Sequence, residues 1–172
     1  VVLALLESGH NVIVIDSFSN STRESLLRVA DLAGEIAASR LTAITGDIRD
    51  ASDLAKAFSA VPTDNCVDAV LHFAGLKAVG ESVRLPLNYW DVNFAGTCQL
   101  LKAMQNYGCR TLVFSSSCTV YGVPEKIPVH EDSPITPINP YGATKAAVEQ
   151  MLSDLALSQN GWRIASLRYF NP

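Results

Sequence analysis

The chain alternates between two patterns of apolar residues. Short, almost uninterrupted apolar runs are typical of strands in a parallel sheet that is buried on both faces. Longer segments in which apolar residues recur every three or four positions predict amphipathic helices. The apolar runs lie at residues 11–16, 41–45, 68–73, 110–116 and 163–168, and the periodic segments at 1–8, 22–39, 50–59, 86–107 and 141–160.

This alternation predicts the fold class. Strands that take turns with helices favour an α/β domain with a doubly wound, mostly parallel, Rossmann-like sheet that helices cover on both faces. We expect Trp90 and Phe94 in the core, and Asp50 as the cap of the third helix. The second helix is expected to bury an apolar stripe made of Leu26, Leu27, Ala30, Ala33 and Ala37.

The beginning of the chain predicts that one strand is absent. Residues 1–8 have the pattern of the second half of a helix, and the sequence contains no G-x-G-x-x-G or G-x-x-G-x-x-G turn. In a Rossmann fold that turn follows the first strand, which is central in the order 3-2-1-4-5-6. We therefore expect a fragment whose missing strand belongs between residues 11–16 and 68–73. The isolated polypeptide is predicted to be unstable and inactive, because two strands would lack their shared neighbour.

The composition narrows the class of protein. With 172 residues, 48% hydrophobic and 17% charged, the chain can bury the core of one globular domain. Its formal net charge of −4 argues against a broad nucleic-acid or anionic-membrane surface, and no apolar run is long enough to span a bilayer. The four cysteines are irregularly spaced without a C-x-x-C, so we expect reduced thiols in the cytoplasm and no metal site.

One stretch, residues 111–145, carries a candidate proton-transfer group. An apolar run ends in three serines, the last of which is Ser117, and a proline-rich loop leads to Tyr141 and Lys145. On a helix, residues four apart share one face, and a fixed ammonium beside a phenol favours the phenolate. Ser117, at a strand end, could bond the same phenol or a substrate oxygen. Together the three side chains could take a proton from an alcohol whose carbon loses a hydride.

Other candidate residues lie at the strand ends, where a parallel sheet binds its ligands. Asp16 stands where an acidic side chain accepts hydrogen bonds from the adenosine ribose of NAD and repels the 2′-phosphate of NADP; a loop or capping aspartate is the alternative. Asp47 could face an adenine edge or cap a turn. His72 lies inside an apolar run and is expected to be a core histidine. Lys77 could meet a ribose or phosphate, or be solvated.

Five segments carry a resemblance to a known family. They are Gly46–Asp50, His72–Val83, Ser115–Gly122, Asn139–Lys145 and Leu167–Pro172. In the sequences and the order of these segments, the chain resembles the extended short-chain dehydrogenases/reductases, and within them the UDP-glucose 4-epimerase family, over essentially its whole length. The resemblance implies that residues 1–172 are part of an NAD-binding Rossmann domain, and that the family's C-terminal sugar-nucleotide domain is mostly missing.

The resemblance implies an enzyme that interconverts UDP-glucose and UDP-galactose. A tightly bound NAD would take the hydride from C4 of the sugar, and the 4-keto sugar would turn and receive it on its opposite face. Tyr141, as phenolate, would take the proton of the 4-hydroxyl group. Lys145 would favour that phenolate and bind the nicotinamide ribose, and Ser117 would bond the sugar oxygen.

The resemblance also assigns binding residues and partners. The residues near NAD are Asp16, Asn20, Ser21, Asp47, Ile48, Phe73, Ala74, Gly75, Lys77, Asn93, Tyr141, Lys145 and Phe170. The residues near the UDP-sugar are Lys77, Ser117, Tyr141 and Asn171. The full-length protein is expected to be a cytoplasmic homodimer that pairs through the helices at 86–107 and 141–160.

Three other functions compete with the epimerase reaction. A sugar-nucleotide dehydratase of the same superfamily carries Asp-Glu just after the serine position, where this chain has Cys118 and Thr119, which cannot serve as that acid and base. A decarboxylase of the superfamily stays open as an alternative. A non-catalytic dinucleotide-binding protein is disfavoured by the intact serine, tyrosine and lysine. Two departures from the family are Cys118 in place of alanine and Val92 in place of an asparagine near the cofactor.

Overall fold

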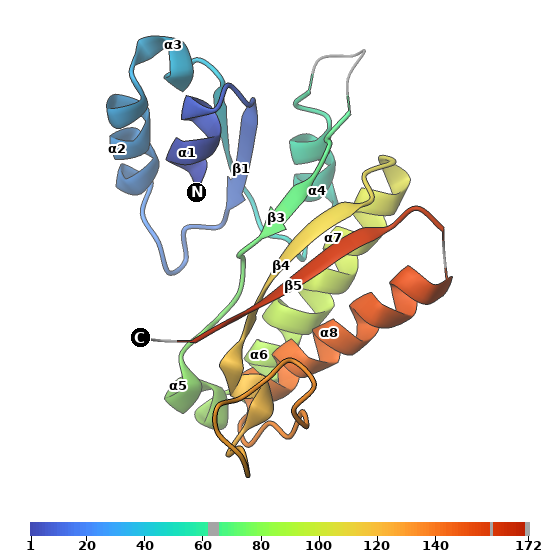
Figure 1. Cartoon of the computed structure of the whole chain (residues 1–172). Helices are drawn as coiled ribbons and strands as arrows, with labels where there is room; N and C mark the ends of the chain where they lie inside the picture. The colour runs from blue at the N-terminus through green and yellow to red at the C-terminus, as the bar shows by residue number, and fades with distance from the viewer. Residues whose placement is uncertain (62–65, 159, 171–172) are drawn as a thin grey trace.

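The structure is a computed structural model that describes residues 1–61, 66–158 and 160–170. Strands alternate with helices along the chain, as the sequence predicts (Figure 1). The strands are β1 (Val12–Asp16), β2 (Leu41–Thr45), β3 (Val70–His72), β4 (Thr111–Ser117) and β5 (Arg163–Tyr169). The α-helices are α1 (Val2–Glu7), α2 (Glu24–Ala33), α3 (Glu35–Ala38), α4 (Ala51–Phe58), α5 (Val79–Arg84), α6 (Pro86–Tyr89), α7 (Gly96–Asn106) and α8 (Pro140–Ser158). A π-helical segment, η1 (Trp90–Ala95), and a 3-10 turn, η2 (Cys118–Tyr121), complete the set within the described residues.

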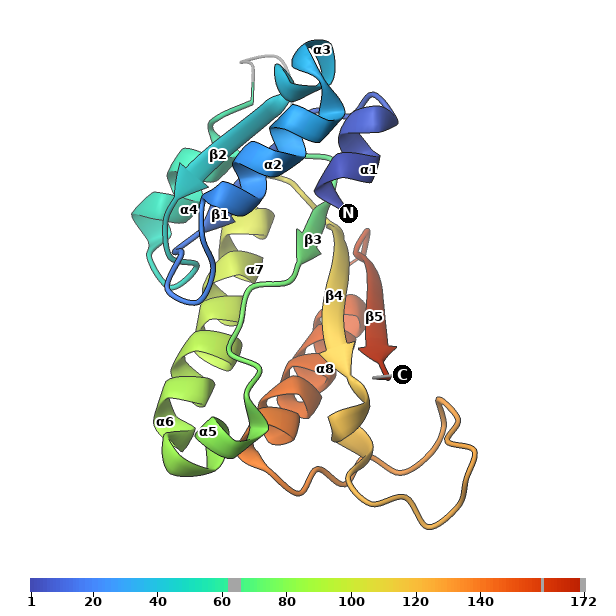
Figure 2. The ribbon, with the colours of Figure 1, turned by 90° about the vertical axis from the view of Figure 1, so that its left-hand side faces the viewer.

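The strands form two parallel sheets rather than one. β1 pairs with β2, and β4 lies between β3 and β5, with every pair of described strands parallel. Figures 1 and 2 show the β1–β2 sheet beside β3 rather than joined to it. The break falls between β1 and β3, which is where the sequence predicts that a strand is absent. The parallel Rossmann-like class is confirmed, and each of these two strands presents an edge at the break.

Helices α7 and α8 lie on one face of the β3–β4–β5 sheet and bury most of the core (Figure 1). Helix α4 packs against both α7 and β1, so it holds the two sheets together. Burying each large apolar side chain in such a core stabilises the fold by roughly 1.5–3 kcal/mol. The core includes Ile48, Leu54, Phe58, Leu100, Leu101, Met104, Cys109, Leu112, Phe114, Val148 and Leu152.

The β1–β2 part of the molecule is less buried than the sequence predicts. All five residues of β1 are half-buried, and α2 contains no buried residue, with Leu27 60% exposed. The prediction of a strand buried on both faces is therefore wrong, and the predicted stripe is half-buried at Leu26, Ala30, Ala33 and Ala37 and exposed at Leu27, because a two-stranded sheet offers too little surface to cover these residues fully. The predicted helix over residues 22–39 is also two helices. Gly34, with φ of +78°, separates α2 from α3, a backbone conformation that favours glycine.

The predicted helix over residues 86–107 is continuous but not uniform. It runs through α6, η1 and α7, and the middle segment is π-helical. Trp90, expected in the core, is 38% exposed and packs edge-on against Phe94 with 5.8 Å between ring centres. The cap of α4 is confirmed, since the Asp50 side chain accepts the Ser52 and Asp53 N–H groups.

Candidate active site

The end of β4 and the first turns of α8 bring the predicted catalytic residues to one place. Lys145 is buried, and its Nζ donates a hydrogen bond to the carbonyl oxygen of Ser115 at 2.8 Å. The same ammonium lies 5.9 Å from the centre of the Tyr141 ring, one helical turn earlier, and 4.8 Å from that of Phe114. Ser117 follows Ser115 by two residues and ends the strand. The lysine therefore links the tyrosine's helix to the serine's strand.

The approach of α8 to β4 depends on two residues at the start of the helix. The side-chain oxygen of Asn139 accepts the Gly142 N–H at 2.8 Å, which is the hydrogen bond of a helix N-cap. A Cβ atom on Gly142 would lie 2.7 Å from the carbonyl oxygen of Thr119, which is closer than packing allows. Glycine thus permits the helix to begin directly against the turn that follows Ser117.

Ser117 is held by the same turn. Its hydroxyl oxygen accepts hydrogen bonds from the backbone N–H of Thr119 at 3.2 Å and from the Thr119 hydroxyl at 3.0 Å. Because the Ser117 oxygen is the acceptor in both bonds, neither bond uses its own proton. That proton can be donated to a ligand oxygen.

Burial controls the charges near this cluster. Lys145 is 6% exposed, and burial lowers its pKa from 10.5 to about 8. His72 is 3% exposed, and burial, followed by the nearby Lys145 charge, lowers its pKa to about 3. The imidazole of His72 is therefore neutral at pH 7, and its Nε2 shares a 2.8 Å hydrogen bond with the Thr97 hydroxyl. This confirms the prediction of a satisfied core histidine.

The end of β3 approaches Lys145 through a glycine. A Cβ atom on Gly75 would lie 2.9 Å from Oδ1 of Asn93 and 3.8 Å from Nζ of Lys145. The Asn93 side chain accepts the Leu76 N–H at 2.7 Å and donates to the Leu76 carbonyl at 2.9 Å. A second donation, to the Thr144 hydroxyl at 3.2 Å, reaches α8. Asn93 therefore fixes the backbone after β3 against the helix that carries Lys145.

Tyr89 packs against Tyr141, the predicted catalytic tyrosine. The two rings meet edge to face, with 6.4 Å between their centres. The Tyr89 hydroxyl lies 2.8 Å from both the Ala78 carbonyl oxygen and the Glu81 carboxylate, to which it can donate. Burial, with a smaller contribution from Glu81, raises the pKa of Tyr89 to about 12. Tyr89 therefore stays a neutral phenol beside Tyr141.

The ends of β1 and β2 carry a second group of predicted residues. Asp16 accepts hydrogen bonds from the Phe18 N–H at 2.8 Å and the Ser21 hydroxyl at 3.0 Å, and Asn20 is exposed in the same loop. The Gly46 N–H donates to the Asp16 carbonyl at 3.1 Å, so the two strand ends adjoin.

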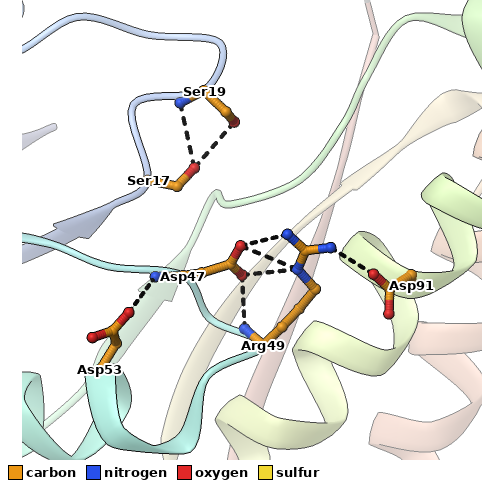
Figure 3. A network of polar contacts seen from close by, with 6 residues as sticks. All are labelled: Ser17, Ser19, Asp47, Arg49, Asp53 and Asp91. Carbon is orange, nitrogen blue, oxygen red and sulfur yellow. Dashed lines mark hydrogen bonds and ion pairs between the residues drawn. The ribbon is translucent and has the colours of Figure 1, made fainter.

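Asp47 lies in the network shown in Figure 3. Arg49 binds its carboxylate with Nη2 at 2.6 Å and reaches Asp91 of η1 with Nη1 at 2.5 Å. The hydrogen bonds from Arg49 hold the pKa of Asp47 below its usual value. The network therefore ties the end of β2 to the π-helical segment that contains Asn93.

The remaining predicted residues differ in exposure. Ile48 is buried, Ala74 is half-buried, and three others, Phe73, Lys77 and Phe170, are exposed. The Phe170 ring stacks on Tyr121 with 6.2 Å between centres. Asn171, predicted to lie near the sugar nucleotide, falls outside the described residues.

The described part of the chain contains neither a candidate metal site nor a candidate membrane-spanning helix. It contains no cluster of three or more histidine, cysteine, aspartate or glutamate residues arranged to hold a metal ion. None of its helices combines the length and apolar character needed to cross a membrane.

Comparison with known proteins identifies the family. The model of the family described as "NAD dependent epimerase/dehydratase family" matches residues 1–172. The chain belongs to the NAD dependent epimerase/dehydratase family. This epimerase/dehydratase chain is 51% identical to UDP-glucose 4-epimerase 2 of Arabidopsis thaliana over 171 residues, which cover 99% of the chain and 47% of that protein. The chain thus spans about half the length of the curated relatives it matches.

Solved structures agree with the fold of this epimerase/dehydratase chain. The UDP-glucose 4-epimerase of Bifidobacterium longum, in complex with NAD+ and UDP, superposes with a TM-score of 0.91 at 41% identity and covers 99% of this chain and 49% of its own. The enzyme from Stenotrophomonas maltophila, with bound NAD and formylated UDP-arabinopyranose, gives a TM-score of 0.89 at 43% identity, over 99% of this chain and 48% of its own.

Sequence patterns do not predict three side chains that the structure places at this epimerase/dehydratase site. Tyr89 contacts Tyr141, and Glu149 forms an ion pair with Arg168 beside Ser116, the residue before Ser117. One signal was present for Glu149, since it lies four residues after Lys145 and eight after Tyr141, on the same helix face. For Tyr89 and Arg168 no local pattern exists, because their partners lie on other elements.

Proposed function

We propose that the protein containing this chain interconverts UDP-glucose and UDP-galactose by transient oxidation at C4 of the sugar. One observation carries the proposal: Lys145 is buried against the end of β4, with Tyr141 one turn away and Ser117 at the strand end. Such a grouping of a phenol, an ammonium and a hydroxyl can serve proton removal from a sugar alcohol. Relatives named UDP-glucose 4-epimerase support the substrate class.

The residues present fit NAD, which supplies a hydride acceptor when it is bound. The Gly75 backbone comes near Lys145, and only glycine leaves that space open, as close contact between a backbone and a flat ring requires. Asp16, at the end of β1, would accept hydrogen bonds from a ribose, which favours NAD over NADP. Asp47 already accepts four contacts from Arg49, so an adenine edge would have to share this carboxylate.

Each catalytic side chain has a separate task. Tyr141, as phenolate, takes the proton of the sugar 4-hydroxyl and returns it when the alcohol is formed again. Lys145 favours the phenolate by its charge and binds the nicotinamide ribose. Ser117 donates its proton to the sugar oxygen, which places that oxygen beside the phenol. Inversion at C4 requires the sugar to turn in the site, so the grip on the substrate must fall on its UDP group.

Further proposals concern the rest of the binding site and the assembly. We assign Asn20, Ser21, Ile48, Phe73, Ala74, Asn93 and Phe170 to the surroundings of NAD, and Lys77 and Asn171 to the UDP-sugar. Residues 1–172 form part of the NAD-binding domain. We also propose a cytoplasmic location and a homodimer that pairs through α6–α7 and α8, and the exposed apolar side chains of Leu87 and Trp90 support the pairing.

The function is tested by incubating the protein with UDP-glucose and separating UDP-galactose by chromatography. Tyr141→Phe should lower turnover by about 10²–10⁴-fold, the usual contribution of a general acid–base, and should leave NAD bound. Tyr107→Phe, which changes an exposed tyrosine that stacks on Phe58, is the control and should be as active as wild type. Bound NAD without any UDP-galactose would instead indicate a non-catalytic dinucleotide-binding protein.

A further inference from the structure

A half-buried ion pair contacts the strand end that carries Ser117, through the neighbouring Ser116. Arg168 of β5 binds Glu149 of α8 in a two-pronged contact: Nη2 donates to Oε2 at 2.7 Å, and Nε lies 3.0 and 3.1 Å from the two carboxylate oxygens. The two side chains are 19% and 8% exposed, respectively. The pair therefore joins the last strand to the catalytic helix, one turn beyond Lys145.

The same pair includes the strand that ends in Ser117. Ser116 is the register partner of Arg168, so their side chains share one face of the sheet. The Ser116 hydroxyl donates to Oε1 of Glu149. The Glu149 carboxylate of α8 thus binds both β4 and β5. Its contact on β4 is Ser116, the residue immediately before Ser117.

Arg168 also reaches the proline-rich loop of residues 122–139. Its Nη1 donates to the Tyr121 hydroxyl at 2.6 Å and to the Glu131 carbonyl oxygen at 2.9 Å, and the guanidinium lies 5.0 Å from the centre of the Tyr121 ring. The Thr136 hydroxyl adds a bond to the Tyr121 carbonyl at 2.9 Å. The 122–139 loop is therefore attached at Glu131, which Arg168 binds, and at Thr136, which binds Tyr121.

Stability alone does not account for this arrangement. Shielding two charges from most of the water costs solvation free energy that offsets much of their attraction, and apolar residues of similar size often stabilise a fold as well or better. The pair instead fixes the relative orientation of its two side chains, because a guanidinium in a two-pronged contact holds both partners in one plane. Here the fixed groups are the neighbours of Ser117, Tyr141 and Lys145.

We propose that Arg168 and Glu149 are positioning residues for the active site: they hold the 122–139 loop and the end of β4 against α8, and so set the placement of Ser117 relative to Tyr141. The catalytic consequence rests on the proposed function, whereas the attachment of the loop does not. The two parts are therefore measured separately.

The experiment uses the protein as its gene encodes it, with the variants Glu149→Gln and Tyr121→Phe. Tyr121→Phe removes only the hydroxyl that Arg168 binds and leaves the ring packed. Arg163→Lys, on the same strand but bonded to Thr111, and Asp154→Asn, exposed on α8, are the matched controls. Native-state trypsin cleavage after the exposed Lys126 reports on the loop, and kcat, KM and NAD retention report on the site.

Both test variants should be cut after Lys126 at least about tenfold faster than the controls, because the loop opens more often. For Glu149→Gln, kcat should fall by about 10–100-fold, the effect of a misplacement of about 1 Å, with KM and NAD retention unchanged. If Glu149→Gln fails to fold, Tyr121→Phe tests the proposal through its cleavage rate and its kcat, and we expect a smaller fall in kcat for this variant.

Three results would overturn the proposal. The first is cleavage at the control rate in both variants, which would mean that the pair does not hold the loop. The second is faster cleavage with unchanged kcat, which would mean that holding the loop does not position the active site. The third is a loss of NAD retention in proportion to the loss of kcat, which would indicate a general structural role. If wild type makes no UDP-galactose, the proposed function fails, and the cleavage rates still decide whether the loop is held.

Discussion

At the scale of single residues, the site depends on a cation that is kept away from water. Lys145 donates to a backbone carbonyl oxygen, and its pKa falls to about 8 because burial disfavours the ammonium. A lysine with this pKa is charged at pH 7 and loses its charge just above neutrality. An exposed lysine would stay charged to above about pH 10. The environment of Lys145 thus brings its titration into the working range of an enzyme.

This predicts a pH dependence of turnover. Since the pKa of Lys145 is lowered to about 8, its side chain is mostly protonated below that pH and loses its charge as the pH rises through that value. We expect kcat for UDP-glucose to fall above pH 8, by up to about tenfold per pH unit. Lys145→Met should lower kcat by about 10²-fold or more and abolish this limb of the profile. Lys102→Met, exposed on α7, should keep the wild-type profile, and a flat wild-type profile from pH 7 to 9.5 would contradict this role.

At the scale of elements, the site is made by close approaches rather than by loops alone. The start of α8 touches the turn after β4 at Gly142, and the backbone after β3 nears α8 at Gly75. The segment η1 supplies the third contact, since π-helical geometry places Asn93 where it binds both polar groups of Leu76. Such π-helical insertions are frequent at functional sites.

The contact between α8 and the β4 turn predicts the effect of one methyl group. In Gly142→Ala, the new Cβ would meet the Thr119 carbonyl at 2.7 Å, so the helix or the turn must shift. We expect a loss of about 1–3 kcal/mol in the free energy of unfolding, measured by urea denaturation, and a lower kcat because Ser117 and Tyr141 move apart.

Gly80→Ala is the matched control for this change. Gly80 lies in α5, and no atom comes within 4 Å of the position that a Cβ would occupy. Alanine should therefore be neutral there or should stabilise the helix by up to about 1 kcal/mol. Equal stability and activity in the two variants would show that the approach of α8 to Thr119 is not tight.

At the scale of the whole molecule, the two sheets are joined by side-chain packing rather than by a shared hydrogen-bond ladder. Helix α4 contacts both β1 and α7, and Arg49 connects the end of β2 to η1. The exposed pair of Arg49 and Asp91 adds little, because surface ion pairs are typically worth at most about 1 kcal/mol. The β1–β2 half is therefore held weakly to the β3–β4–β5 half.

We accordingly predict that the 172-residue polypeptide by itself is unstable and inactive. Its edges at β1 and β3 leave backbone groups unpaired, which disfavours folding and promotes association. Calorimetry should show no sharp thermal transition, and titration should show no binding of NAD. A cooperative transition together with NAD binding would contradict the prediction.

Local patterns of the sequence were enough to determine the order and type of most elements and to propose Ser117, Tyr141 and Lys145 as the catalytic residues. Apolar runs and helical periodicity depend on neighbours only a few residues away, and Tyr141 and Lys145 lie on one face because the helix repeat places them there. The strand ends followed from the parallel order.

Tertiary structure decided the rest. The exposure of α2 and Trp90, the burial of Lys145 and the pair of Glu149 with Arg168 depend on elements far apart in the chain. Whether a helix face is covered, and which pKa shifts follow, is set by the surface that packs against it, and no local pattern contains that information. The candidate residues of the site could thus be named from the sequence, whereas their support by neighbouring elements emerged only from packing.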